Sequence, residues 1–208
     1  MDFLALCQRT VLESGISETG PSSVIGQTSD LLRMVNWVND AWFELQASRN
    51  QWKWMLKSTG VPIVTGKNKY QLPSDVKNIV LDTLCLNGQR LYELPIPTHN
   101  CNERLSTSRP TGYYLNYKDE IVLSSIPDQN YTLSFEYFGK PELLQENLST
   151  PDMPEEYHMI IVWAALREYA MYDEAPELYQ KGENNFTKIL TRLENNMLPS
   201  LQLAGPLA

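Results

Sequence analysis

The stretch YTLSFEYFG at residues 131–139 alternates polar side chains with apolar ones, and the apolar series includes Leu133, Phe135 and Tyr137. A period of two residues is typical of a β-strand that buries one face. A different pattern follows at residues 155–172, EEYHMIIVWAALREYAMY, where apolar side chains occupy nearly every face of a helix. Such a segment is typical of a central, buried helix. Together the two stretches predict a fold that mixes strands and helices.

Extended segments are predicted along much of the chain before residue 131. They are Trp52 with Trp54, VPIV at 61–64, KYQL at 69–72, IVLDTLCL at 79–86, YYLNY at 113–117 and IVLSSI at 121–126. Asn87-Gly88 is a strong signal for a hairpin turn after the fourth of these segments, and the last two form a second hairpin. Short strands with this spacing predict an antiparallel sheet or a small sandwich.

Helices are predicted on both sides of the β-rich region. Besides the central helix they span residues 2–14, 31–45 and 177–195. Gly15 is predicted to end the first helix, and Ser29 is predicted to cap the second. Trp37 and Ala41 widen the apolar stripe of the second helix, which predicts that this helix is covered on more than one side.

The order of these segments predicts an α+β fold, in which N- and C-terminal segments form a helical bundle and an antiparallel β-domain is inserted between them. The expected domains are a helical domain of residues 1–52 and 150–196, a β-rich insertion of residues 53–149, and a tail of residues 197–208. The tail, MLPSLQLAGPLA, has apolar residues and no charged side chain, so we expect it to dock on a partner.

Charge argues against tight binding of nucleic acid. The chain of 208 residues has 17 Lys and Arg against 25 Asp and Glu, a net charge of −8. Its basic residues are scattered, whereas binding of a phosphate backbone depends on Lys and Arg that displace counterions. The N-terminal stretch lacks the cationic region of a secretory signal, and no apolar run approaches the roughly 20 residues of a membrane span. We expect an acidic protein that neither wraps DNA nor enters a membrane.

Motifs for catalysis and metal binding are missing from the sequence. Cys7, Cys85 and Cys101 form no C-x-x-C pair, which predicts reduced thiols and neither a disulfide nor a zinc site. His99 and His158 lie too far apart for a His-based metal motif, and we interpret His158 as a core histidine. Two acidic groups flank helix boundaries, where carboxylates stabilise helix ends; they are Asp152 with Glu155 and Glu156, and Asp173 with Glu174 and Glu177. We predict no catalytic residue, no metal ligand and no cofactor-binding residue.

Aromatic side chains are the most informative functional feature. The sequence has five Trp and eleven Tyr, residue types that dominate protein–protein interfaces and also line sugar-binding surfaces. The predicted interface residues are four aromatics and three leucines of the tail, namely Trp52, Trp54, Tyr113, Tyr114, Leu198, Leu201 and Leu203. A protein interface and a sugar-binding face are both open at this point.

The order and spacing of several short motifs carry a resemblance. The motifs are YQLPSD at 70–75, IVLDTLCLNGQRL at 79–91, RPTGYY at 109–114, IVLSSIPDQNYTLSFEY at 121–137 and MPEEYHMIIVWAAL at 153–166. Following a Trp-rich helix at 31–49, they resemble the head-to-tail adaptor, or connector, proteins of tailed bacteriophages, in particular the podovirus-type portal adaptors. The resemblance covers residues 2–195.

The resemblance implies a structural virion protein at the head–tail junction that is made in the host cytoplasm. Such adaptors form a dodecameric ring beneath the portal protein and contact a tail nozzle or tail tube protein. The genomic DNA passes through the channel without specific binding, and the family implies no enzyme activity, no cofactor and no membrane. Net acidity suits such a conduit, because a negative lumen repels the phosphates of the passing DNA.

Two other classes stay open on the sequence. A carbohydrate-binding or tail-associated recognition module would use the Trp- and Tyr-rich β-region and would be retained on glycans. A hydrolase would lose activity when His158 or His99 is replaced by alanine. An adaptor would bind a portal and be inert to glycans.

Overall fold

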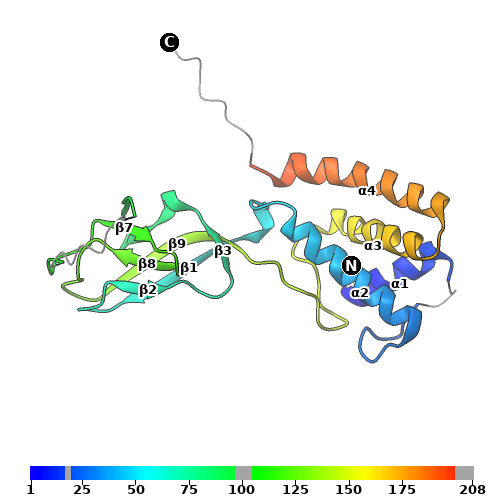
Figure 1. The fold of residues 1–208 in the computed structure, drawn as a ribbon, viewed down its shortest axis with the longest axis horizontal. Coiled ribbons are helices and arrows are strands. Elements are labelled where there is room, and N and C mark those ends of the chain that lie inside the picture. The colour runs from blue at the N-terminus through cyan, green and yellow to red at the C-terminus, as the bar shows by residue number, and fades with distance from the viewer. Residues whose placement is uncertain (17–19, 97–104, 200–208) are drawn as a thin grey trace, which may run out of the picture. The chain divides into compact units, whose positions relative to one another are not determined.

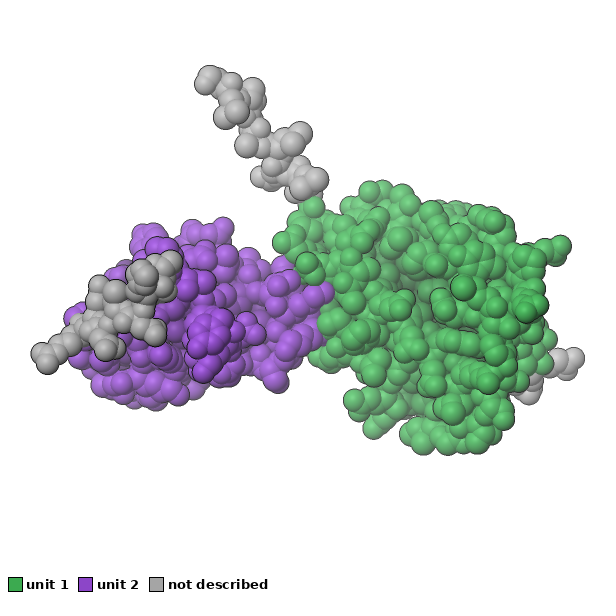
Figure 2. All heavy atoms as spheres, viewed as in Figure 1, with its two compact units in different colours: residues 1–55, 141–208 green, residues 56–140 purple. Residues whose placement is uncertain are grey.

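The computed structural model describes residues 1–16, 20–96 and 105–199, and the chain forms two compact units. The helical unit comprises Met1–Met55 and Pro141–Ala208, and the β-unit comprises Leu56–Lys140 (Figures 1 and 2). Helices come from both ends of the chain and the strands from its centre. The predicted α+β fold class is therefore confirmed.

The helical unit is built around its third helix. Its helices are α1 (Phe3–Ser14), α2 (Ser29–Ala47), α3 (Met159–Tyr172) and α4 (Pro176–Met197). Helix α3 packs against each of the other three, and lies between α4 and the pair of α1 and α2 (Figure 1). The buried residues of α3 are Ile160, Ile161, Val162, Trp163, Ala165, Leu166, Tyr169 and Ala170. This burial confirms the central helix that the apolar run predicts.

The predicted end of α1 is confirmed, whereas the predicted cap of α2 is not. Gly15 ends α1 in the left-handed conformation, with φ of 74°, and its N–H donates to the Val11 carbonyl, as predicted. The prediction that Ser29 caps α2 is wrong. Thr28 occupies the cap position without a side-chain hydrogen bond, and Ser29 is already the first helical residue, with φ of 54°.

The β-unit contains two sheets that share one core. The first sheet has β1 (Leu56–Ile63), β9 (Tyr131–Gly139), β4 (Cys85–Leu86) and β5 (Gln89–Arg90) in that order, and β3 (Val76–Ile79) also pairs with β9. The second sheet has the order β2 (Lys69–Gln71), β8 (Glu120–Leu123), β7 (Gly112–Leu115) and β6 (Tyr92–Glu93). Apolar side chains of both sheets form a single buried cluster that includes Ile63, Tyr113, Ile121 and Leu133.

Strand β9 and both hairpin turns agree with the sequence patterns. Along β9, buried and exposed side chains alternate from Tyr131 to Tyr137, because only one face meets the core. Asn87 and Gly88 both have positive φ, 47° and 77°, between β4 and β5. This pair of values is typical of the tight hairpin turn that Asn-Gly predicts. The second hairpin joins β7 to β8.

Two predicted extended segments and the predicted antiparallel pairing differ from the structure. The run 79–86 is interrupted by a 3-10 turn at Leu81–Thr83, where the Thr83 hydroxyl donates to the Val80 carbonyl and accepts from the Glu136 N–H. Strand β6 pairs with β7 in parallel, so the second sheet is mixed and not purely antiparallel. The segment around Trp52 and Trp54 is not a strand, since a 3-10 turn spans Lys53–Met55.

The limits of the two units differ from the expected domain limits at both junctions. Residues 53–55 and 141–149 belong to the helical unit. The second segment is held on α2 by two side-chain amides that each donate to and accept from its backbone, with Asn39 bonding Leu144 and Gln46 bonding Glu142 at 2.9–3.1 Å. The two side-chain amides satisfy backbone N–H and C=O groups of Glu142 and Leu144 that have no strand or helix partner. They thereby bind a segment without regular structure to α2.

Candidate interaction surface

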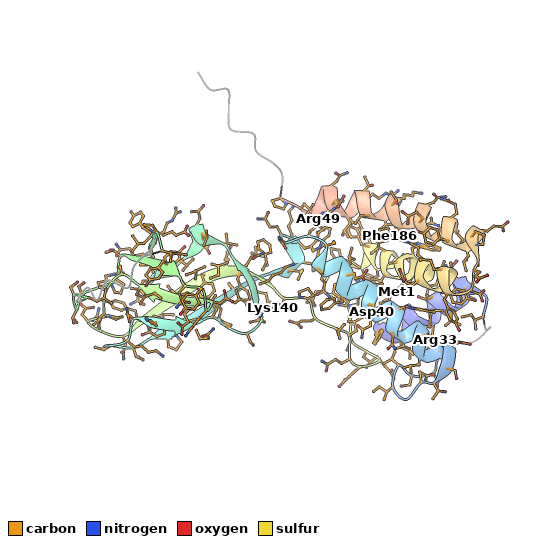
Figure 3. The ribbon with its side chains drawn as sticks, in the orientation of Figure 1. Met1, Arg33, Asp40, Arg49, Lys140 and Phe186 are labelled. Carbon is orange, nitrogen blue, oxygen red and sulfur yellow. The ribbon has the colours of Figure 1, made fainter. Side chains whose placement is uncertain are left out.

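An open groove of about 560 Å³ lies between α2 and α4, with α3 as its floor. Its apolar lining includes Trp37, Ala41 and Phe43 of α2, Ala164 of α3, and Phe186 and Leu190 of α4. Figure 3 labels Phe186, together with Asp40 and Arg49, which also line the groove. Phe43 is 41% exposed, although its side chain is large and apolar. An apolar surface of this kind is typical of a site that a partner covers.

Acidic side chains outnumber basic ones around the groove. The acidic residues of the lining are Asp40, Glu44 and Glu168, and the basic ones are Arg49 and Arg167. Both arginines have ion-pair partners, since Arg49 contacts Glu194 and the Arg167 Nε lies 3.0 Å from a carboxylate oxygen of Glu183. The groove therefore favours an occupant that is apolar and carries no negative charge.

Two of the predicted interface residues are completely buried. Trp52 has no exposed surface and donates its indole N–H to the Leu45 carbonyl at 2.9 Å. Tyr113 has none either, and burial raises its pKa to about 12. Each belongs to the interior of its own unit, so neither side chain lies on the surface of the chain.

The other predicted interface residues are partly accessible or lie outside the described residues. Trp54 is partly buried and stacks on Trp52 with ring centroids 4.4 Å apart, and Tyr114 is partly buried in β7. Leu198 is partly buried directly after α4. Leu201 and Leu203 lie outside the described residues, as do His99 and Cys101.

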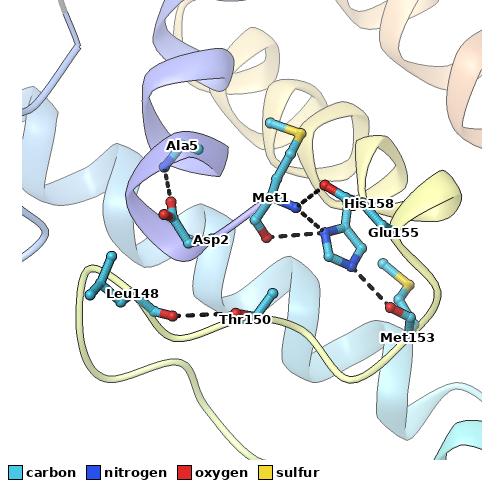
Figure 4. Close-up of polar contacts among 8 residues, drawn as sticks. All are labelled: Met1, Asp2, Ala5, Leu148, Thr150, Met153, Glu155 and His158. Atoms are coloured by element: carbon cyan, nitrogen blue, oxygen red, sulfur yellow. Dashed lines mark hydrogen bonds and ion pairs between the residues drawn. The ribbon is translucent and has the colours of Figure 1, made fainter.

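His158 is enclosed by the first residue of the chain and by the segment before α3 (Figure 4). The side chain is 2% exposed. Its Nε2 lies 2.9 Å from the Met153 carbonyl and therefore donates a proton, while Nδ1 lies 2.8 Å from the Met1 amine and 3.0 Å from the Met1 carbonyl. Since both nitrogens have partners, neither is available to a substrate, which agrees with the interpretation of His158 as a core histidine.

The acidic groups at the helix boundaries also have structural partners. Glu155 accepts from the Met1 amine at 2.9 Å, and this hydrogen bond and the positive charge hold the pKa of Glu155 below its usual value. Asp173 accepts from the Tyr169 hydroxyl at 3.0 Å at the end of α3. Glu155 lies before the N-terminus of α3, where a negative charge is favourable, whereas Asp173 lies at the C-terminal end of α3 and is held there by its hydrogen bond.

In the part of the chain that the structure describes, the Cys7 thiol is buried and potential metal ligands do not cluster. Burial raises the pKa of the Cys7 thiol to about 12, which suppresses the reactive thiolate. Among residues 1–16, 20–96 and 105–199, no three His, Cys, Asp or Glu side chains gather as metal ligands would. Nor does any helix in these ranges have the length and apolar character needed to cross a membrane.

Sequence reasoning missed the groove but detected one of its walls. Trp37 and Ala41 widen the apolar stripe of α2, and both line the groove. The distance between α2 and α4 along the chain explains why their common groove leaves no local pattern.

An open apolar groove of this kind is typical of a protein that binds a partner. The family comparison agrees with this class: the family model described as SU10 adaptor protein matches residues 1–205. The chain belongs to the SU10 adaptor protein family, which confirms the resemblance to phage head-to-tail adaptors. A search of curated proteins finds no match.

Proposed function

We propose that this adaptor is a structural virion protein that forms a ring at the head–tail junction, joins the portal to a tail nozzle or tail tube, and continues the DNA channel. The observation that carries this proposal is the match of an adaptor family to nearly the entire chain, residues 1–205. The dodecameric ring is the assembly that the resemblance implies. In this assembly the genomic DNA passes through the channel without specific binding.

Exposed apolar side chains support an assembly role. A closed ring needs two different lateral faces on each copy, in addition to its contacts above and below. The helical unit exposes Leu148 at 79% and Ile25 at 67%, and the β-unit exposes Tyr117 at 90%. We further propose that the tail, residues 197–208, which starts at the last residue of α4, reaches the portal.

The test is the mass of the complex formed when the purified adaptor is mixed with the portal ring of the same phage. Native mass spectrometry should find saturable binding of about one adaptor chain per portal subunit, as a shared ring symmetry requires. A variant that ends at Pro199 should bind less tightly if the tail contacts the portal. Absence of any complex at micromolar concentrations refutes the adaptor proposal, and retention on a glycan array would then favour a recognition module.

A further inference from the structure

The longest stretch of the sequence without a charged side chain is residues 195–208, NNMLPSLQLAGPLA. It begins in the last turn of α4 and contains Leu198, Leu201, Leu203 and Leu207. A segment with leucines and no charge buries apolar area without desolvating an ion. Its composition therefore matches the apolar, acid-rimmed groove between α2 and α4.

The tail begins at one end of that groove. The last turn of α4 is held against the end of α2, since Arg49 pairs with Glu194 and the Lys53 ammonium donates to the Asn196 carbonyl at 2.8 Å. Arg49 itself lines the groove. Helix α4 ends at Met197, and the next residue, Leu198, has an extended backbone with φ of −94° and ψ of 151°. The chain leaves the helix where the groove begins.

The length of the tail is sufficient for a return along the groove. The distance from Leu198 back to Leu190, a residue that lines the groove, is roughly 12 Å along the helix axis at 1.5 Å per residue. Residues 200–208 span up to about 30 Å when extended at ~3.3 Å per residue. Reversal of the chain after Leu198 is compatible with Pro199, which cannot continue the helix.

We propose that residues 200–208 occupy the α2–α4 groove of their own helical unit in the adaptor free of portal. The tail leucines cover the apolar side chains around Phe43, Phe186 and Leu190, and the side chains of the tail add no negative charge near Asp40 and Glu44. The proposal does not depend on the ring: it holds or fails in the isolated chain.

Disulfide trapping in the full chain tests the contact. The test variant combines Leu203→Cys with Ser48→Cys, because Ser48 lines the groove beside Arg49. The matched control combines Leu203→Cys with Glu146→Cys, since Glu146 is exposed on the segment that Asn39 and Gln46 hold on the other side of α2. Cys85 and Cys101 are replaced by serine in both variants, whereas the buried Cys7 is kept.

The expected result is an intramolecular disulfide that forms at least about tenfold faster in the Ser48→Cys variant than in the control, because docking raises the effective concentration of the two thiols. Adding Phe43→Glu places a further acid in the groove and should reduce the rate to that of the control. Equal rates in the two cysteine pairs would overturn the proposal. Disulfides that join ¹⁵N-labelled to unlabelled chains would assign the groove to the tail of a second copy and would overturn it as well.

Discussion

Replacement of His158 by alanine removes a ring that ties three parts of the helical unit together. The ring contacts the Met1 amine, the Met1 carbonyl and the Met153 carbonyl at 2.8, 3.0 and 2.9 Å from the start of α3. Because the side chain is 2% exposed, water does not replace these contacts readily. We expect the variant to fold with a less stable helical unit.

The magnitude follows from the contacts that are lost. Each hydrogen bond contributes about 1 kcal/mol net, and a buried carbonyl left without a donor costs about 1–3 kcal/mol. The cavity left by the ring adds to the loss. Together these effects predict that His158→Ala lowers the free energy of unfolding of the helical unit by about 2–4 kcal/mol.

Tryptophan fluorescence during urea unfolding measures this change selectively. All five tryptophans, Trp37, Trp42, Trp52, Trp54 and Trp163, belong to the helical unit, so their emission reports its unfolding and not that of the β-unit.

The matched variants separate the buried ring from the exposed ion pair next to it. His158→Gln retains a donor and should recover part of the loss, and Glu155→Gln should leave the unfolding midpoint unchanged, because the Glu155 carboxylate is 80% exposed. A loss below about 1 kcal/mol for His158→Ala would refute the reasoning that the ring is a structural link.

Three further outcomes can be measured in the same protein. Cys7, with a pKa of about 12, should resist iodoacetamide at pH 8 until the chain unfolds, while the less buried Cys85 reacts first, as located by peptide mass spectrometry. Asp75→Asn should destabilise the β-unit by less than about 1 kcal/mol at pH 7. Because the hydrogen bond from Tyr137 lowers the pKa of Asp75, the difference should begin to shrink as pH falls below 3.8 and disappear below the lowered pKa, in urea titrations followed by circular dichroism. Gly15→Ala should lower the thermal midpoint of the helical unit by the equivalent of about 1 kcal/mol, since φ is 74° there, and an unchanged midpoint would contradict this.

The features that the sequence predicts well are those with a local period. The alternation of β9 and the apolar run of α3 are correct, because burial on one face or on all faces imposes a repeat that neighbouring residues reveal. Asn87-Gly88 is correct for a related reason, since positive φ at two successive residues restricts which residues fit.

The features that the sequence does not predict depend on contacts between distant segments. Parallel pairing of β6 with β7 joins Tyr92 to Gly112, which lie 112 − 92 = 20 positions apart in the sequence. The attachment of residues 141–149 to α2 depends on Asn39 and Gln46, which look like ordinary polar residues of a helix. The groove also depends on contacts between distant segments, since α2, α3 and α4 line it. In the sequence, Trp37 indicates that α2 is covered on more than one side, but it does not indicate which segment covers it.

Charge is unevenly distributed between the two units. The helical unit has 8 Lys and Arg against 17 Asp and Glu, a net charge of −9, while the β-unit has 9 against 8, a net charge of +1. The negative net charge of the whole chain, −8, therefore comes entirely from the helical unit. Because screening limits such effects to a Debye length of roughly 10 Å, any repulsion of DNA depends on the charge of the nearest surface and not on that of the whole chain.

Two charge-reversal variants with the same total charge test this argument. Glu146→Lys with Glu156→Lys changes the helical unit from −9 to −5, whereas Glu93→Lys with Glu136→Lys changes the β-unit from +1 to +5; all four glutamates are exposed. Only the second variant should be retained on immobilised duplex DNA at low salt, since it alone presents a unit with a large positive charge. Equal elution of the two variants would mean that total charge governs the interaction, and the acidic-conduit argument would then apply to the whole chain.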